Sequence, residues 1–89
     1  MITQKIEIIN KLGLHARASS KLVSLANSFS SKLTIIKDNK TANLKSIMGV
    51  MMLAVSKGME ITLTADGEDE SAAITALVGL INDKFGEGE

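Results

Sequence analysis

The pattern of apolar and polar residues predicts a strand at the start of the chain and a helix from residue 16. Residues 2–8 alternate with a period of two, which is typical of a half-buried strand. One face of this segment consists of Ile2, Gln4, Ile6 and Ile8, and the other of Thr3, Lys5 and Glu7. From residue 16 the apolar positions follow helical spacing, so we expect an amphipathic helix that begins at or just after His15. Its apolar stripe consists of Ala18, Leu22, Leu25, Ala26 and Phe29.

The middle of the chain has the pattern of a hairpin followed by a short helix. Residues 33–36 predict a second strand, residues 38–40 a tight turn and residues 41–44 a short third strand. Ser46 can act as the N-cap of a helix over residues 47–53, because its hydroxyl can accept a hydrogen bond from a first-turn N–H group. We expect Lys57 and Gly58 to close this helix.

The last third of the chain predicts a fourth strand and a longer helix. Residues 59–65 alternate again, and Asp66 and Gly67 form a turn. The final helix is expected to start near Asp69, with Gly86 as its C-cap and residues 87–89 as a frayed tail. Its apolar stripe consists of Ala73, Ile74, Leu77, Val78, Leu80, Ile81 and Phe85.

Together these elements follow the order βαββαβα in a single domain, residues 1–89. The short turns and the strand spacing favour antiparallel pairing. The predicted fold class is therefore α+β, an open-faced sandwich in which three helices cover one face of a four-stranded antiparallel sheet. Such sandwiches serve many functions, so the fold class alone predicts none of them.

The composition excludes several classes of site. The 89 residues include one His, no Cys and no Pro, and 10 basic residues balance 10 acidic ones. Without cysteine there is no disulfide, thiolate metal site or thiol nucleophile, and one histidine excludes a His-rich metal site. Zero net charge and the absence of Trp and Tyr argue against nucleic acid as a partner. We therefore expect no metal, no cofactor and no nucleic-acid binding.

The apolar segments are too short for a membrane protein. The longest run, residues 48–55, is far below the roughly 18 residues that a membrane span needs, and the alternating N-terminus does not resemble a signal peptide. We expect a cytoplasmic, monomeric protein without membrane insertion. A domain of this size buries only about 60–65% of its unfolded surface, so the function should lie at the surface.

The most specific local feature is His15 followed by Arg17 at the start of the predicted first helix. First-turn N–H groups lack helical partners and the helix dipole favours negative charge, so the N–H groups of Ala16 and Arg17 can bind phosphate. The Arg17 guanidinium can hold phosphate oxygens in a bidentate fork. The positive helix end also favours a neutral His15 ring, which could accept a phosphoryl group. The alternative is a helix-capping histidine beside an unrelated arginine.

Three segments carry a resemblance to a known family: residues 11–17 (KLGLHAR), 43–51 (NLKSIMGVM) and 65–70 (ADGEDE). They resemble the HPr family, the histidine-containing phosphocarriers of the bacterial phosphoenolpyruvate-dependent phosphotransferase system. The resemblance covers essentially the whole chain. It implies that Nδ1 of His15 accepts a phosphoryl group from phosphorylated enzyme I and passes it to a histidine of a sugar transporter IIA component. It further implies that Arg17 neutralises the phosphate and that the protein is a carrier rather than an enzyme.

The same resemblance assigns roles around the predicted second helix. Ser46 matches a regulatory serine that a dedicated HPr kinase/phosphorylase modifies in some bacteria, while the alternative is an ordinary N-cap. Ile47, Met48 and Met51 match positions that contact enzyme I and IIA components. We expect Val50 and Leu53 to belong to the core. The alternative is that the whole Met-rich helix is buried.

Two other functions stay open at this stage. One is the nitrogen-branch paralogue, which has the same fold and phosphohistidine but a regulatory role. The other is a small α+β module that binds a partner without covalent chemistry. One departure from the family pattern is Ala18, where many members have proline after the arginine. Proline would fix the first helical turn, so Ala18 bears on the transfer rate more than on the chemistry.

Overall fold

The elements of the computed structural model, which describes residues 1–87, follow the predicted order βαββαβα. They are β1 (Ile2–Glu7), α1 (Ala16–Ala26), β2 (Lys32–Lys37), β3 (Lys40–Asn43), α2 (Ile47–Met51), β4 (Glu60–Asp66) and α3 (Glu70–Asn82), followed by the 3-10 turn η1 (Lys84–Gly86). None of the helices in this described part is long and apolar enough to cross a membrane.

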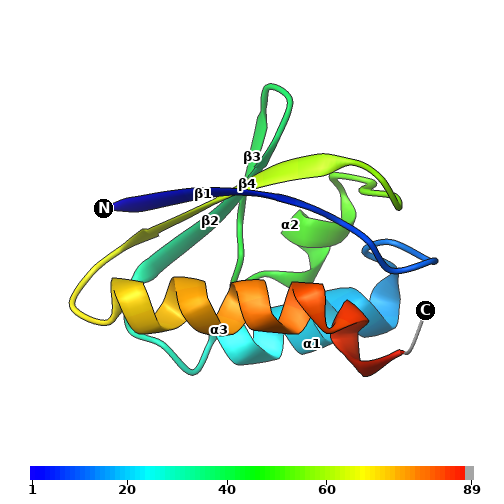
Figure 1. Ribbon diagram of the computed structural model, residues 1–89. Coiled ribbons are helices and arrows are strands. Elements are labelled where there is room, and N and C mark those ends of the chain that lie inside the picture. Colours follow the sequence, from blue (N-terminus) through cyan, green and yellow to red (C-terminus); the bar gives the residue numbers. More distant parts are fainter. Residues whose placement is uncertain (88–89) are drawn as a thin grey trace.

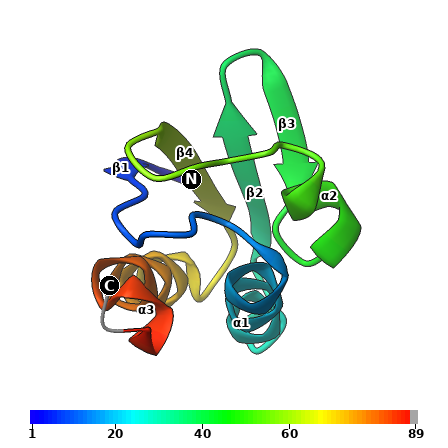
Figure 2. The same cartoon turned by 90° about the vertical axis from the view of Figure 1, so that its right-hand side faces the viewer.

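The four strands form one antiparallel sheet in the order β1-β4-β2-β3. Helices α1 and α3 run side by side beneath the sheet, and α2 packs against α1 and β3 (Figures 1 and 2). The opposite face carries polar side chains, among them Thr34 and Thr64, whose hydroxyls hydrogen-bond to each other across the strands. This arrangement confirms the predicted open-faced sandwich.

The core lies between the sheet and the two long helices. Strand β4 buries Ile61, Leu63 and Ala65 on its helix-facing side, as alternation requires. The helix stripes are mostly as predicted, although Leu25, Phe29, Val78 and Leu80 are only partly buried. Ser19 is fully buried, and its hydroxyl is satisfied there because it donates a hydrogen bond to the Leu14 carbonyl at 3.0 Å.

Two predicted helix ends are wrong. Helix α2 ends at Met51 rather than continuing to Leu53 and Lys57. The backbone N–H groups of Leu53 and Ala54 donate to carbonyls only three residues earlier, and Ala54 then adopts a φ of 53°, which a helix cannot accommodate. Helix α3 ends at Asn82 rather than at Gly86. Phe85 adopts a φ of 56° and is 1% exposed, so its ring enters the core instead of extending the helix.

Candidate functional site

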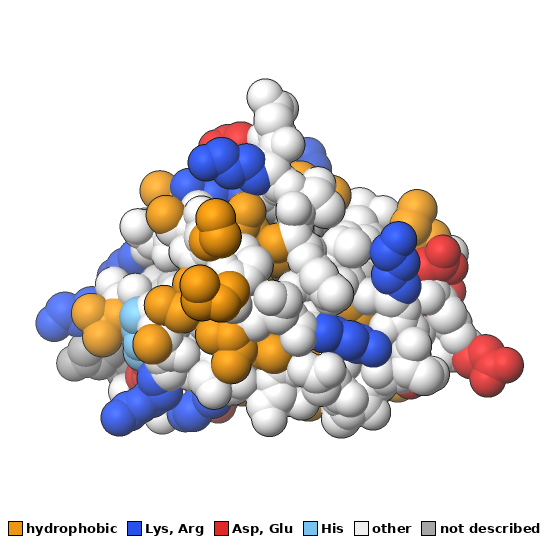
Figure 3. Space-filling model, turned by 180° about the vertical axis from the view of Figure 1, so that it is seen from behind, with side chains coloured by type: hydrophobic (Ala, Val, Ile, Leu, Met, Phe, Trp, Pro, Cys, Tyr) orange, Lys and Arg blue, Asp and Glu red, His pale blue; other side chains and the backbone are white. Residues whose placement is uncertain are grey.

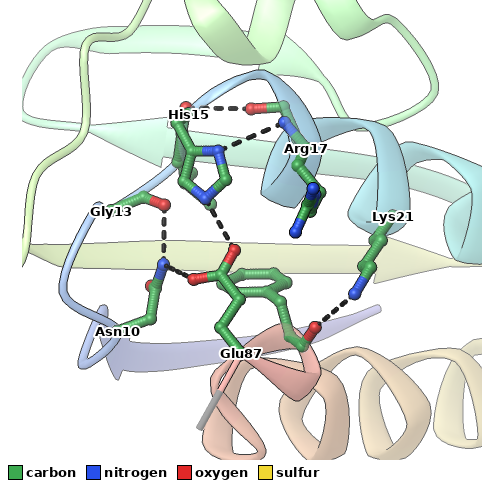
Figure 4. Close-up of polar contacts among 9 residues, drawn as sticks. Asn10, Gly13, His15, Arg17, Lys21 and Glu87 are labelled. Atoms are coloured by element: carbon green, nitrogen blue, oxygen red, sulfur yellow. Dashed lines mark hydrogen bonds and ion pairs between the residues drawn. The ribbon is translucent and has the colours of Figure 1, made fainter. Parts of the chain in front are cut away.

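His15 is the N-cap of α1, as the sequence predicts. Its backbone is extended, with φ −72° and ψ −179°, and its ring nitrogen Nδ1 accepts a hydrogen bond from the Arg17 backbone N–H at 3.2 Å (Figure 4). An acceptor nitrogen carries no proton, so the Nδ1 lone pair faces the positive end of the helix. The site therefore presents a potential nucleophile where negative charge is favoured.

The loop before His15 is held by close backbone packing. Gly13 has a φ of +63°, and a Cβ at this position would lie 2.6 Å from the Val55 carbonyl oxygen. That same carbonyl accepts a hydrogen bond from the Leu14 N–H at 3.0 Å. Asn10, which is fully buried, donates from Nδ2 to the Gly13 carbonyl at 2.8 Å. Only glycine fits here, and the backbone that leads into His15 is fixed as a result.

Glu87 contacts the other side of the imidazole. Its Oε2 lies 2.6 Å from Nε2 of His15, and its Oε1 accepts a hydrogen bond from Asn10 Nδ2 at 3.1 Å (Figure 4). The Glu87 side chain is 13% exposed, so the expected frayed tail is wrong at this residue. Residues 88 and 89 lie outside the described residues. Phe85, two residues earlier, is 1% exposed, so the chain is anchored in the core just before Glu87.

The pKa of the Glu87 carboxyl is lowered by its partners. Burial acts in the opposite direction and raises this pKa, but the hydrogen bonds with Asn10 and His15 and the positive charge of Lys21 outweigh it. Glu87 is consequently ionised at neutral pH and faces Nε2 as an acceptor.

Sequence reasoning missed both Glu87 and Asn10. Glu87 is 72 residues from His15 along the chain, so no local spacing connects them. The only sequence signal for Glu87 was Phe85, which belongs to the apolar stripe and was expected in the core. A buried Phe85 limits where the residues that follow it can lie.

The predicted phosphate-binding residues line one open depression of 650 Å³. Its lining consists of Lys11, Leu12, His15, Ala16, Arg17, Gly86 and Glu87. Ala16 and Arg17 are exposed, and within residues 1–87 the Arg17 guanidinium makes no ion pair. The side chain of Arg17 lies on the same side of α1 as the His15 ring (Figure 4). A tetrahedral anion on Nδ1 would meet N–H donors and a guanidinium in this depression.

Ser46 is the N-cap of α2, which confirms the structural part of its prediction. Its backbone is extended, with φ −120° and ψ 116°, and its Oγ accepts a hydrogen bond from the Gly49 N–H at 3.2 Å. The residue is half-buried, with its hydroxyl beside a groove bordered by β3 and α2. Modification of Ser46 stays a prediction.

The three predicted docking residues are all exposed: Ile47 by 42%, Met48 by 70% and Met51 by 39%. Val50 of α2 and Leu53, which follows the helix, are both buried, as expected. The short helix therefore has an outer face and an inner face. Figure 3 shows hydrophobic side chains gathered over α2 beside the histidine. The alternative of a wholly buried helix is therefore wrong.

Two further exposed apolar residues were not assigned to the docking surface. Met52 is 75% exposed, and Leu12, which lines the depression at His15, is 65% exposed. The only sequence signals were the Met-rich run for Met52 and the apolar side chain in a loop for Leu12. Each signal fits a buried core position as well as an exposed docking position.

Comparison with known families and structures adds an independent observation. The family model for the "PTS HPr component phosphorylation site", where PTS is the phosphotransferase system, matches residues 2–83. The chain belongs to the HPr family. It is 56% identical over 89 residues to phosphocarrier protein HPr of Neisseria meningitidis, with 100% of both proteins covered. The resemblance carried by the three sequence segments is thereby confirmed.

Members of the HPr family with solved structures share the fold closely. The crystal structure of HPr from Thermoanaerobacter tengcongensis matches with a TM-score of 0.95 at 54% identity, covering 98% of each chain.

Phosphocarrier protein NPr of Shewanella violacea is also similar in sequence, with 42% identity over 86 residues that cover 97% of this chain and 94% of that protein. The family is thus one of phosphocarriers and includes more than one branch.

Proposed function

We propose that this protein is a cytoplasmic, monomeric phosphocarrier that accepts a phosphoryl group on Nδ1 of His15 from phosphorylated enzyme I. It then donates the group to IIA components of sugar transporters. The observation that carries this proposal is the position of Nδ1, which is unprotonated and directed at the N-terminus of α1. Membership of the HPr family supports the same chemistry.

The transfer needs positioning and charge neutralisation rather than a cofactor. The Nδ1 lone pair forms the new N–P bond while the N–P bond of the donor histidine breaks, and its electrons return to the donor ring. The phosphoryl group then replaces Nδ1 as the acceptor of the Arg17 N–H, with the Ala16 N–H beside it. The Arg17 guanidinium stabilises the negative charge on the phosphoryl oxygens.

The apolar residues on the outer face of α2 supply the proposed docking surface. Ile47, Met48 and Met51 are exposed beside the site, and flexible methionine side chains can pack against more than one partner. This matches a carrier that must bind enzyme I and the IIA components in turn through one surface.

We also propose that phosphorylation of Ser46 by an HPr kinase/phosphorylase slows the transfer. The phosphate would add a charge of about −1.5 to −2 next to the docking residues Ile47 and Met48. Ser46→Asp should therefore reduce the rate of His15 phosphorylation, whereas Ser46→Ala, which removes the cap without adding charge, should not. Equal rates for Ser46→Asp and wild type would contradict this regulation.

A second candidate is the nitrogen-branch phosphocarrier, which the 42% identity to an NPr protein favours. Its chemistry at His15 would be the same, but its phosphoryl donor would be a different enzyme I. The higher identity to HPr proteins, 56%, favours the sugar branch.

Intact-mass measurement distinguishes these functions. Wild type and His15→Ala are incubated with phosphoenolpyruvate, Mg²⁺ and purified sugar-branch enzyme I, and any adduct is tested for acid lability. We expect one acid-labile phosphoryl group on wild type and none on the variant. Labelling only by the nitrogen-branch enzyme would support the second candidate, and no labelling by either enzyme would leave a non-covalent binding module.

A further inference from the structure

Both nitrogen atoms of the His15 ring have a hydrogen-bond partner. One partner lies in the first turn of α1, and the other lies 72 residues away along the chain. The Arg17 N–H donates to Nδ1 at 3.2 Å, and the Glu87 carboxylate lies 2.6 Å from Nε2 (Figure 4). We propose that Glu87 is a positioning residue that fixes His15 in the tautomer protonated at Nε2 and stabilises the positive charge that the ring acquires during transfer. This inference rests on the proposed phosphocarrier function.

The two contacts select the same tautomer. A neutral imidazole has one donor and one acceptor nitrogen. Because Nδ1 accepts a hydrogen bond from the Arg17 backbone N–H, Nδ1 carries no proton of its own. The one proton of the neutral ring is therefore on Nε2. An ionised carboxylate has only acceptor atoms, so the Nε2–H group donates its hydrogen bond to Glu87. Nδ1 is thereby kept ready for attack on phosphorus.

The transfer itself places positive charge on the side that faces Glu87. When the Nδ1 lone pair forms the N–P bond, the ring keeps its Nε2 proton and becomes an imidazolium. No proton moves in this step, and the electron pair of the broken N–P bond stays on the donor ring. The carboxylate at Nε2 stabilises the cation, as the aspartate of a Ser-His-Asp triad does. In the donating step His15 leaves as a neutral imidazole because Nε2 is still protonated.

Glu87 is held by a dedicated set of contacts. Asn10 donates from Nδ2 to both Glu87 Oε1 and the Gly13 carbonyl, while its own Oδ1 is buried without a hydrogen-bond partner within residues 1–87. A buried oxygen without a partner lowers the stability of the fold. The two hydrogen bonds that Nδ2 donates are therefore what this asparagine contributes to the structure. Lys21 donates to the Phe85 carbonyl at 2.6 Å, which ties the 3-10 turn to α1.

The test compares three carboxylate variants with wild type. Glu87→Gln keeps the size and removes the charge, Glu87→Asp keeps the charge on a shorter side chain, and Asp83→Asn removes an exposed carboxylate of the same segment as a matched control. Transfer from phosphorylated enzyme I is measured by rapid quench, the His15 tautomer by ¹⁵N NMR at pH 9, where imidazoles are neutral, and folding by thermal melting.

We expect Glu87→Gln to melt like wild type, to accept the phosphoryl group about 10–100-fold more slowly and to show a larger share of the tautomer protonated at Nδ1. Glu87→Asp should recover part of the rate, and Asp83→Asn should match wild type in every measurement. A Glu87→Gln variant with the rate and tautomer of wild type would overturn this inference while leaving the proposed function intact. Absence of His15 labelling in wild type would overturn both.

Discussion

Gly13 lies two residues before His15 and combines a positive φ with a close backbone contact. In Gly13→Ala the new Cβ would lie 2.6 Å from the Val55 carbonyl oxygen and 2.8 Å from Ser56 Cα. Both neighbours are backbone atoms, so they cannot move aside as a flexible side chain can. The Val55 carbonyl is also the acceptor for the Leu14 N–H, so a shift would weaken that hydrogen bond.

The chain offers a matched control at Gly58, whose φ is +88° and whose Cβ would meet nothing within 4 Å. Both alanine variants place a side chain at positive φ, which costs about 1–2 kcal/mol. Only Gly13→Ala adds the overlap with Val55 and Ser56, and overpacking of this kind costs about another 1–3 kcal/mol. For a domain of this size each kcal/mol lowers Tm by about 4–8 °C.

We therefore expect thermal unfolding of Gly13→Ala at least about 4 °C below that of Gly58→Ala. Because residue 13 leads directly into the His15 loop, transfer from enzyme I should also slow in Gly13→Ala at temperatures where it is fully folded. Equal melting temperatures for the two alanine variants would refute the reasoning, since they would show that the contact with Val55 is not tight.

Three further stability predictions concern other parts of the fold. Ser46→Ala removes the acceptor for the Gly49 N–H and should lower the free energy of unfolding by about 1 kcal/mol, measured by urea denaturation. Phe85→Ala leaves a cavity in the core and should cost about 3–5 kcal/mol in the same assay; a loss below 1 kcal/mol would contradict its burial. Asp69 accepts hydrogen bonds from the Ser31 hydroxyl and from the backbone at Ser30 and Ser31, which lower its pKa from 3.8 to about 2. Since this pKa is lower in the folded state, its stabilisation is present above pH 3.8 and is lost as the pH falls through about 2. Thermal melting should therefore show Asp69→Asn below wild type at pH 6, with the difference vanishing near pH 2.

Much of the fold could be predicted because its information is local. Alternation in residues 59–65 and the stripe that contains Leu22 and Ala26 each reflect one element that buries one face. The starts of α1 and α2 were predicted well, because each cap is a local contact. The side chains of His15 and Ser46 accept hydrogen bonds from backbone N–H groups two and three residues later. Helix ends were predicted less well. After α2 and α3 the chain turns through residues with positive φ, Ala54 and Phe85, and neither is a residue type whose sequence signals such a turn.

The sequence by itself determined the element order, the open-faced sandwich, the pairing of His15 with the first turn of α1 and the HPr resemblance. Each of these depends on periodicity or on residues adjacent along the chain. Only the tertiary structure decided that Glu87 reaches Nε2 of His15, that Asn10 holds it there, and which methionines of α2 face outward. Contacts between residues 72 positions apart depend on how the packed core directs the backbone, which no local pattern records.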